Sequence, residues 1–132
     1  MKITLDQLHE ARGSLNKLML QDELTAKMKR RLRVLAKEIN ELDKEKEALM
    51  IKHKAKRNER GYYYFAPDQM DELEAYDMEL DELLAEEIEI AYTPVKLKEI
   101  EELKDDKDKP LIKLHAHDYN NLLEVFLEEE AD

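Results

Sequence analysis

The sequence predicts a mainly α-helical protein with a long antiparallel helical hairpin of the coiled-coil type, an N-terminal helix, and a small C-terminal helical unit carrying a short two-stranded ribbon. Charged and hydrophobic residues each make up 42% of the chain, with two glycines and three prolines, as in long helices and coiled coils. Apolar residues recur at spacings of three and four. The charge divides as well, with sixteen Lys and Arg against ten Asp and Glu in residues 1–60 (+6), and six against twenty-three in residues 61–132 (−17), which together give −11.

A chain of 132 residues has the length of one ordinary domain. We expect a single domain over residues 1–132, made of a basic helical half (1–60), an acidic hairpin helix (61–92) and a C-terminal helical unit (93–132). The first helix should begin at Thr4, because Thr4 and Gln7 have the spacing of a capping box. Its apolar positions then follow at helical spacing.

A longer pattern begins near Leu24 and predicts one helix to about Arg57, whose 34 residues would extend for roughly 50 Å. Its heptad seam alternates steps of four and three. We expect the coil to open at the polar seam residues Lys46 and His53, so that both reach water, and the helix to end at Gly61. The seam consists of Met28, Leu32, Leu35, Ile39, Leu42, Lys46, Leu49 and His53.

After an extended aromatic run at residues 62–65, Asp68 is the predicted N-cap of a second helix with apolar residues from Met70 to Leu84. Residues 68–92 hold eleven acidic residues and no Lys or Arg, whereas residues 27–60 hold thirteen basic and six acidic ones. We therefore expect the two helices to pair antiparallel, with opposite charges beside their shared seam. Those charges would orient the hairpin, while apolar burial supplies most of its stability.

In the C-terminal unit, the alternation in residues 87–92 predicts a strand, followed by a short helix from Val95 to Leu103 and a second strand at residues 111–114 that pairs with the first. Asp118 is the expected cap of a last helix, which needs burial against the body or another subunit. The apolar face of that helix comprises Leu122, Leu123, Val125, Phe126 and Leu127.

Several classes of function lack their signatures. Without cysteine there is no disulfide, thiolate metal site or cysteine nucleophile, and a reducing compartment is expected. The sequence has no Gly-rich phosphate loop, nucleophile elbow or zinc-protease motif, and no apolar run long enough for a signal peptide or membrane span. His115, His117 and Asp118 have the spacing of a metal-ligand cluster, but surface histidines and a helix cap explain them better. We therefore expect no enzyme, no cofactor and no metal.

We expect the protein to act by protein–protein interaction through its helical surfaces, as a homo-oligomer or with a basic partner protein, and not at a membrane. Two long helices cannot cover all of the apolar positions, which favours self-assembly. The candidate partner-binding residues are the acidic Asp71, Glu74, Asp81 and Glu82 and the aromatic Tyr62, Tyr63, Tyr64 and Phe65.

Two alternatives remain open. The acidic helix could mimic the phosphates of DNA and inhibit a host nucleic-acid-binding protein, such as a nuclease, a repressor or a defence protein. The basic cluster Lys27, Lys29, Arg30, Arg31 and Arg33, with residues 52–60, could bind nucleic acid directly, although the net charge of −11 argues against it. A salt-bridged or solvated helix face is the favoured interpretation of these cations.

Four segments carry a family resemblance: residues 1–45 (MKITLDQLHEARGSLNKLMLQDELTAKMKRRLRVLAKEINELDKE), the Pro-Asp-x-Met-x-Glu-Leu segment at residues 67–73, the EIEI run and the PVKLKEIEEL segment. In these the chain resembles small uncharacterised helical proteins encoded by bacteriophages and prophages of Gram-positive bacteria. The resemblance implies an accessory phage protein in the cytoplasm of the host bacterium, and it brings no catalytic residues. The YYYF and HAH segments are not part of the family pattern.

Overall fold

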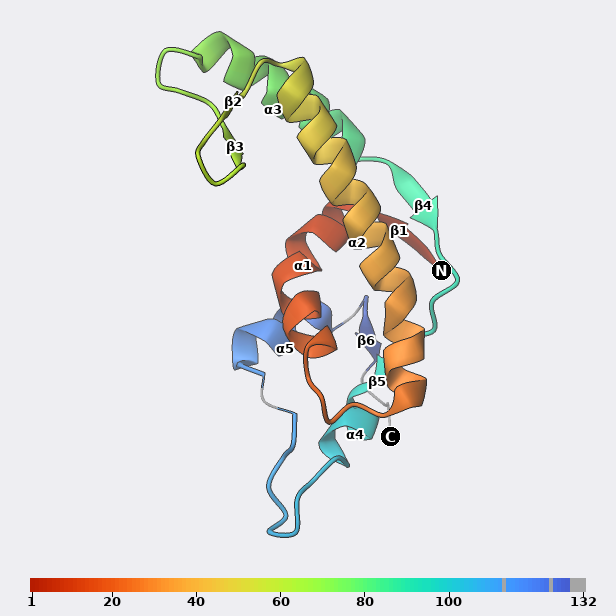
Figure 1. Cartoon of the computed structure of the whole chain (residues 1–132). Helices are drawn as coiled ribbons and strands as arrows, with labels where there is room; N and C mark the ends of the chain where they lie inside the picture. Colours follow the sequence, from red (N-terminus) through yellow and green to blue (C-terminus); the bar gives the residue numbers. More distant parts are fainter. Residues whose placement is uncertain (113, 124, 129–132) are drawn as a thin grey trace.

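A long central helix, α2 (Ala26–Lys52), organises the fold, and the computed structural model describes residues 1–112, 114–123 and 125–128. Helix α1 (Leu5–Met19) packs against α2, and α3 (Met70–Leu84) packs against both. The C-terminal elements gather beside α1 and the N-terminal half of α2 (Figure 1). The prediction of a mainly helical protein is confirmed.

Helix α1 begins where its capping box predicts. The Gln7 amide donates to Thr4 Oγ1 at 3.1 Å, and the Thr4 amide donates to Gln7 Oε1 at 2.9 Å. Leu8, Leu15 and Leu18 are fully buried along one face, so α1 forms a large part of the core.

The predicted seam of α2 is confirmed from Met28 to Leu42, where all five apolar seam residues are buried. They lie in one core with the apolar face of α1 and the buried residues of the C-terminal segments. The N-terminal half of α2 therefore needs no second chain to cover its seam, which removes the argument for self-assembly that rested on it. The homo-oligomer itself stays a prediction.

The predicted C-terminal end of this helix was wrong. Helix α2 ends at Lys52, and Lys54 adopts a left-handed backbone conformation with φ 64°. The chain then turns back as a hairpin of strands β2 (Lys56–Arg57) and β3 (Tyr63–Tyr64), which pair antiparallel. Lys56 and Arg57, which were expected to continue the helix, instead form backbone pairs with Tyr64 and Tyr63 of β3.

Gly61 belongs to the turn of this hairpin, where its φ of 85° suits a residue without a Cβ. The Asn58 amide donates to the Tyr62 carbonyl at 2.8 Å, and Asn58 Oδ1 accepts from the amides of Arg60 and Tyr62, each at 2.9 Å. A glycine after basic residues is thus a turn position in this chain, not a helix end.

Helix α3 runs antiparallel to α2 along its C-terminal half, because Lys52 and His53 meet Glu79 while Glu45 and Ala48 lie beside Glu86. At 15 residues, or about 22 Å, α3 is much shorter than α2 at 27 residues, or about 40 Å. The predicted antiparallel pairing of the two helices is therefore confirmed, but α3 does not extend to the part of α2 that carries the basic cluster, so those cations do not meet the acidic helix.

The predicted N-cap of α3 was also wrong, by one residue. Gln69 occupies the cap position and Asp68 lies exposed before it. The side chain of Gln69 holds the loop instead, since its Nε2 donates to the Lys54 carbonyl at 2.8 Å and its Oε1 accepts from the Ala66 amide at 2.9 Å.

The alternating run forms a strand, but its predicted partner was wrong. Strand β4 (Glu87–Glu89) pairs antiparallel with β1 (Lys2–Thr4), with Ile3 opposite Ile88. Residues 111 and 112 lie outside any strand, although Ile112 is buried, and residue 113 of the expected strand is outside the described residues. Three residues at the chain start give too short a pattern to identify a strand from sequence.

The C-terminal unit contains shorter helices than expected: α4 (Leu97–Glu101) and α5 (Ala116–Leu122). Strands β5 (Val95–Lys96) and β6 (Leu127–Glu128) pair in parallel. The last helix thus ends before most of its predicted apolar face, whose later residues Phe126 and Leu127 are buried in a turn and a strand.

Candidate functional site

The outer face of α3 carries five exposed carboxylates around two exposed methionines, and we call this set the acidic face. Met70 is 66% exposed and Met78 is 69% exposed. Glu74, Asp81 and Glu82 lie one turn from Met78 on the helix surface. In the described part of the chain, no ion pair neutralises any of these carboxylates. The acidic face comprises Met70, Asp71, Glu74, Asp77, Met78, Asp81 and Glu82.

The inner face of α3 behaves differently, because its carboxylate is paired. Glu79 Oε1 accepts from Lys52 Nζ at 2.6 Å and lies 3.0 Å from His53 Nε2. The hydrogen bond from Lys52 is the main cause that lowers the pKa of Glu79. His53 is only 16% exposed at its side chain, so the expectation that it opens to water was wrong.

Charges on the acidic face also oppose the helix dipole. A helix C-terminus carries partial negative charge and is stabilised by cations, by about 0.3–1 kcal/mol for each exposed charge. The last turn of α3 contains no basic residue, and Asp81 and Glu82 lie there instead. This arrangement lowers the stability of α3, and no described cation pairs with Asp81 or Glu82 to offset the loss.

A row of exposed cations follows the N-terminal half of α2, and we call it the basic stripe. They form no ion pair within 4 Å with another described residue, although the charge of Lys27 helps to lower the pKa of Glu99. The interpretation of this row as a solvated helix face stays a prediction. Arg31 alone of the predicted cluster turns inward, with Nη1 3.2 Å from Glu99 Oε2 and Nη2 donating to the Thr93 carbonyl at 3.1 Å. The basic stripe comprises Lys27, Lys29, Arg30, Arg33 and Lys37.

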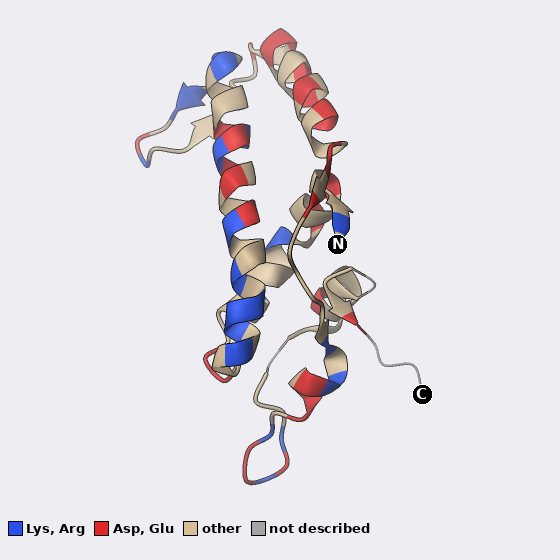
Figure 2. Ribbon diagram, turned by 90° about the vertical axis from the view of Figure 1, so that its right-hand side faces the viewer, with Lys and Arg blue, Asp and Glu red and all other residues tan. Residues whose placement is uncertain are grey.

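The basic stripe opposes its helix dipole too, because the first turn of α2 has no acidic residue and contains Lys27 and Lys29. Beside the stripe is a small hollow of about 200 Å³, which we call the Met19 hollow. Met19, Leu32 and Ala36 supply its apolar lining, and the charged Lys29 and Arg33 border it. Figure 2 shows cations along this half of α2 and carboxylates along α3, which lies beside the other end of α2.

The predicted aromatic residues form a second surface. Tyr62 and Tyr64 are exposed on the β2–β3 hairpin, whereas the Tyr63 ring lies under the Arg57 guanidinium at 5.7 Å. Phe65 packs on Tyr76 of α3, with ring centroids 5.3 Å apart. The hairpin and α3 flank α2 on opposite sides (Figure 2). The predicted partner-binding residues thus divide into two groups.

Sequence reasoning missed a polar groove of about 520 Å³ between α2 and the hairpin. Arg12 binds Asp43 through two hydrogen bonds, of 2.9 and 2.7 Å. Lys46 also lines this groove, and its Nζ lies 3.4 Å from His9 Nδ1. Lys46 is half-buried in this groove, and burial lowers its pKa. Burial and the Lys46 charge likewise lower the pKa of His9. Arg12 and Asp43 are separated by 31 positions in the sequence, and His9 and Lys46 by 37. No local sequence pattern could identify such distant residues as neighbours.

A second missed cluster surrounds Asp118, which is 1% exposed. Asp118 is the third residue of α5 rather than its expected cap, and its Oδ2 accepts from the His115 amide at 3.2 Å. Ser14 Oγ donates to Oδ1 at 2.8 Å, and Lys17 Nζ lies 3.4 Å from the same carboxylate. Burial raises the pKa of Asp118, but the hydrogen bonds, that of Ser14 foremost, outweigh it and lower the value. This cluster attaches α5 to α1.

The histidines beside Asp118 stack on each other, with ring centroids 5.7 Å apart, and His117 Nε2 lies 3.3 Å from Asp118 Oδ1. The carboxylate of Asp118 accepts a hydrogen bond from Ser14 and pairs with Lys17, so its oxygens already take part in contacts that hold the fold together. Within residues 1–112, 114–123 and 125–128, no three His, Asp or Glu side chains are arranged to hold a metal ion.

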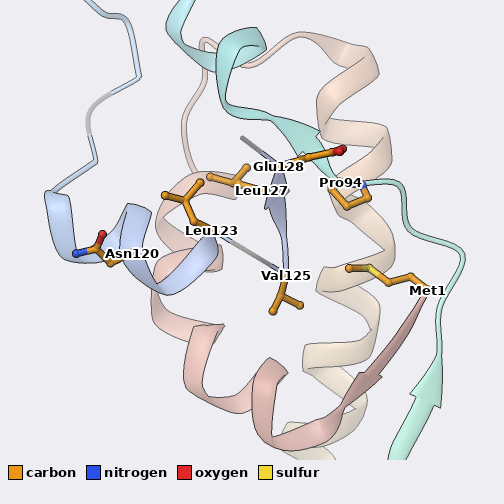
Figure 3. Close-up of a pocket in the computed structure, with 7 residues that line it drawn as sticks. All are labelled: Met1, Pro94, Asn120, Leu123, Val125, Leu127 and Glu128. Atoms are coloured by element: carbon orange, nitrogen blue, oxygen red, sulfur yellow. The ribbon is translucent and has the colours of Figure 1, made fainter. Parts of the chain in front are cut away.

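A larger hollow of about 820 Å³ lies at the C-terminal unit. Figure 3 shows it between Met1 and Pro94 on one side and Leu123 and Asn120 on the other. Its polar side chains, Asn120 and Glu128, are both exposed, so no buried polar group is available to orient a small molecule there.

Among the helices of the described residues, none has the combination of length and apolar character that crossing a bilayer requires. Comparison of the chain with protein-family models, with curated proteins and with solved structures gave no match.

Proposed function

We propose that this chain is a non-catalytic interaction protein that binds a basic protein surface through the acidic face of α3. The observation that carries the proposal is the exposure of Met70 and Met78 among carboxylates that no described residue pairs. Apolar side chains at the centre of a charged ring are the arrangement of a protein-binding surface, because burial supplies affinity and the charges select the partner. The family resemblance supports the role of an accessory protein of a bacteriophage or prophage.

The partner surface should present Lys or Arg around an apolar depression that accepts a methionine. Methionine suits this role because its flexible, polarisable side chain fills irregular pockets. The surrounding carboxylates accelerate association with a basic surface and exclude acidic ones, and both effects weaken with salt.

A photo-crosslinker tests this function. p-Benzoyl-phenylalanine at position 78 should form adducts in Gram-positive bacterial cells that express the chain, whereas the same group at position 107, in an exposed loop, should not. The crosslinked protein is then purified and titrated against the wild-type chain at increasing salt. We expect the affinity to decrease with salt. We also expect the affinity to fall at least about tenfold in a variant that combines Glu74→Lys and Asp81→Lys.

A matched control is Glu102→Lys with Asp106→Lys, which changes the same charge at exposed positions far from α3. This control should bind as the wild type does. Equal loss in both double variants would show that only net charge matters, and the absence of any adduct at position 78 would refute the proposal.

The DNA-mimic alternative is favoured by one observation, namely that no described residue forms an ion pair with the five carboxylates of the acidic face. It predicts that a purified DNA-binding partner is displaced from the acidic face by duplex DNA. Retention of the partner at saturating DNA would exclude mimicry while leaving the interaction function intact.

A further inference from the structure

We propose that the acidic face of one molecule binds the basic stripe and the Met19 hollow of a second copy of this chain, so that copies associate head to tail. This inference rests on the proposed function and specifies the partner. Both surfaces belong to one chain, have opposite charge, and lack ion pairs with other described residues. They cannot neutralise each other within one molecule, because they lie at opposite ends of α2 (Figure 2).

The two surfaces match in spacing along their helices. Arg30 and Lys37 are seven residues apart on α2, and Glu74 and Asp81 are seven residues apart on α3, which is about 10 Å in each case. An antiparallel contact brings Glu74 to Lys37 and Asp81 to Arg30. The charged pairs then form at both ends of a contact two turns long.

The same register places apolar groups together. Between the two charged pairs, Met78 falls opposite Arg33, at the border of the Met19 hollow. A methionine side chain can enter the hollow and cover Met19 and Leu32, while Glu82 reaches Lys29 at its edge. The contact thus pairs an apolar projection within an acidic ring with an apolar depression within a basic border.

The helix dipoles favour the antiparallel orientation. It brings the N-terminal part of α2, with its partial positive charge and cations, against the C-terminal turn of α3, with its partial negative charge and carboxylates. Both surfaces violate the dipole rule within the monomer, and each supplies the charge that the other lacks in the pair. A contact of two different surfaces is heterologous, so it extends into chains of copies or closes into a ring.

The contact is short, since one helix of about 22 Å covers less than a standard protein interface. We therefore expect weak, salt-sensitive association. Sedimentation of the full chain at about 20 mM salt, where charges interact over about 20 Å, should show a mass that rises with concentration. About 500 mM salt should return the monomer.

Charge exchange provides the decisive test. A chain with Glu74→Lys and Asp81→Lys should stay monomeric at low salt, and so should a chain with Arg30→Glu and Lys37→Glu. A chain that carries all four substitutions should associate again, because both signs are reversed. Circular dichroism and the melting temperature establish that each variant is folded, and lost folding would not be restored by adding further substitutions.

Each outcome distinguishes the hypotheses. A wild-type chain that stays monomeric at low salt, or a fourfold variant that does not recover association, overturns head-to-tail assembly. A different protein crosslinked to position 78 would then leave the proposed function standing. If the wild type is monomeric but binds a fluorescent single-stranded DNA, and Arg30→Glu with Lys37→Glu abolishes that binding, the basic stripe is a nucleic-acid surface instead.

Discussion

Helices α1 and α3 are both 15 residues long and pack on the same helix, α2, but they differ in capping, in terminal charges and in burial. Helix α1 has a capping box, an acidic residue in its first turn, a basic residue in its last turn, and six buried residues. Helix α3 has no side-chain cap, no basic residue in its last turn, and two buried residues. The comparison indicates that α1 is built for stability, whereas α3 retains features that cost stability and leaves one face exposed.

Truncation of a core leucine should give the largest difference between the two helices. Leu8→Ala in α1 removes a fully buried side chain and should lower the free energy of unfolding by about 2–5 kcal/mol, because a cavity remains. Leu73→Ala in α3 affects a side chain that is 38% exposed and should cost less than about 1 kcal/mol. Urea denaturation of both variants measures the difference, and equal losses would contradict the comparison.

Acid should weaken the attachment of α5 to α1. The folded-state pKa of Asp118 lies below its unfolded value, so its stabilisation is present above the unfolded value near 4 and is lost as the pH falls through the folded value. Asp118→Asn should lower the melting temperature at pH 7. The difference between wild type and variant should shrink on acidification to about pH 3, and a difference that is constant with pH would contradict this account.

The helix caps should differ as well. Thr4→Ala removes the hydroxyl that accepts from the Gln7 amide in the α1 capping box, and should cost about 1 kcal/mol, or a few degrees of melting temperature. Asp68→Ala should have almost no effect, because Asp68 lies outside α3 and caps nothing there. A comparable loss at Asp68 would show that α3 is capped in solution after all.

The smallest effect should be a gain. Asp81→Lys places a cation at the C-terminal end of α3 and should stabilise the folded monomer by about 0.3–1 kcal/mol, while weakening partner binding. Lys29→Glu should do the same in the first turn of α2. Thermal denaturation at low salt measures both variants, and destabilisation by either would remove the dipole argument for a functional surface.

Local patterns predicted α1, the seam of α2, α3 and strand β4, because capping, heptad spacing and alternation are each contained within a few residues. The end of α2 was mispredicted because pairing with the tyrosine strand overrides the helix propensity of residues 54–57. The partner of β4 was mispredicted because β1 is three residues long. Such pairings depend on distant segments, which periodicity cannot show.

The candidate site was predicted in composition but not in arrangement. Asp71, Glu74, Asp81 and Glu82 do share the exposed face of α3, as their helical spacing required. The charge split suggested that basic and acidic helices neutralise one another. Because α3 is short, the described residues show this at Glu79, which meets Lys52 and His53, and not along the N-terminal half of α2. The hidden contacts of Asp118 with Ser14 and Lys17 join residues about a hundred positions apart, so no sequence motif marked them.

Crosslinking from position 78 tests most directly whether the acidic face is a binding surface. The account predicts adducts, either with a second copy of the chain or with a basic partner, whose yield falls at least about tenfold when Glu74→Lys and Asp81→Lys are introduced. An adduct yield no greater than that from position 107, or one that the charge reversal leaves unchanged, would contradict it.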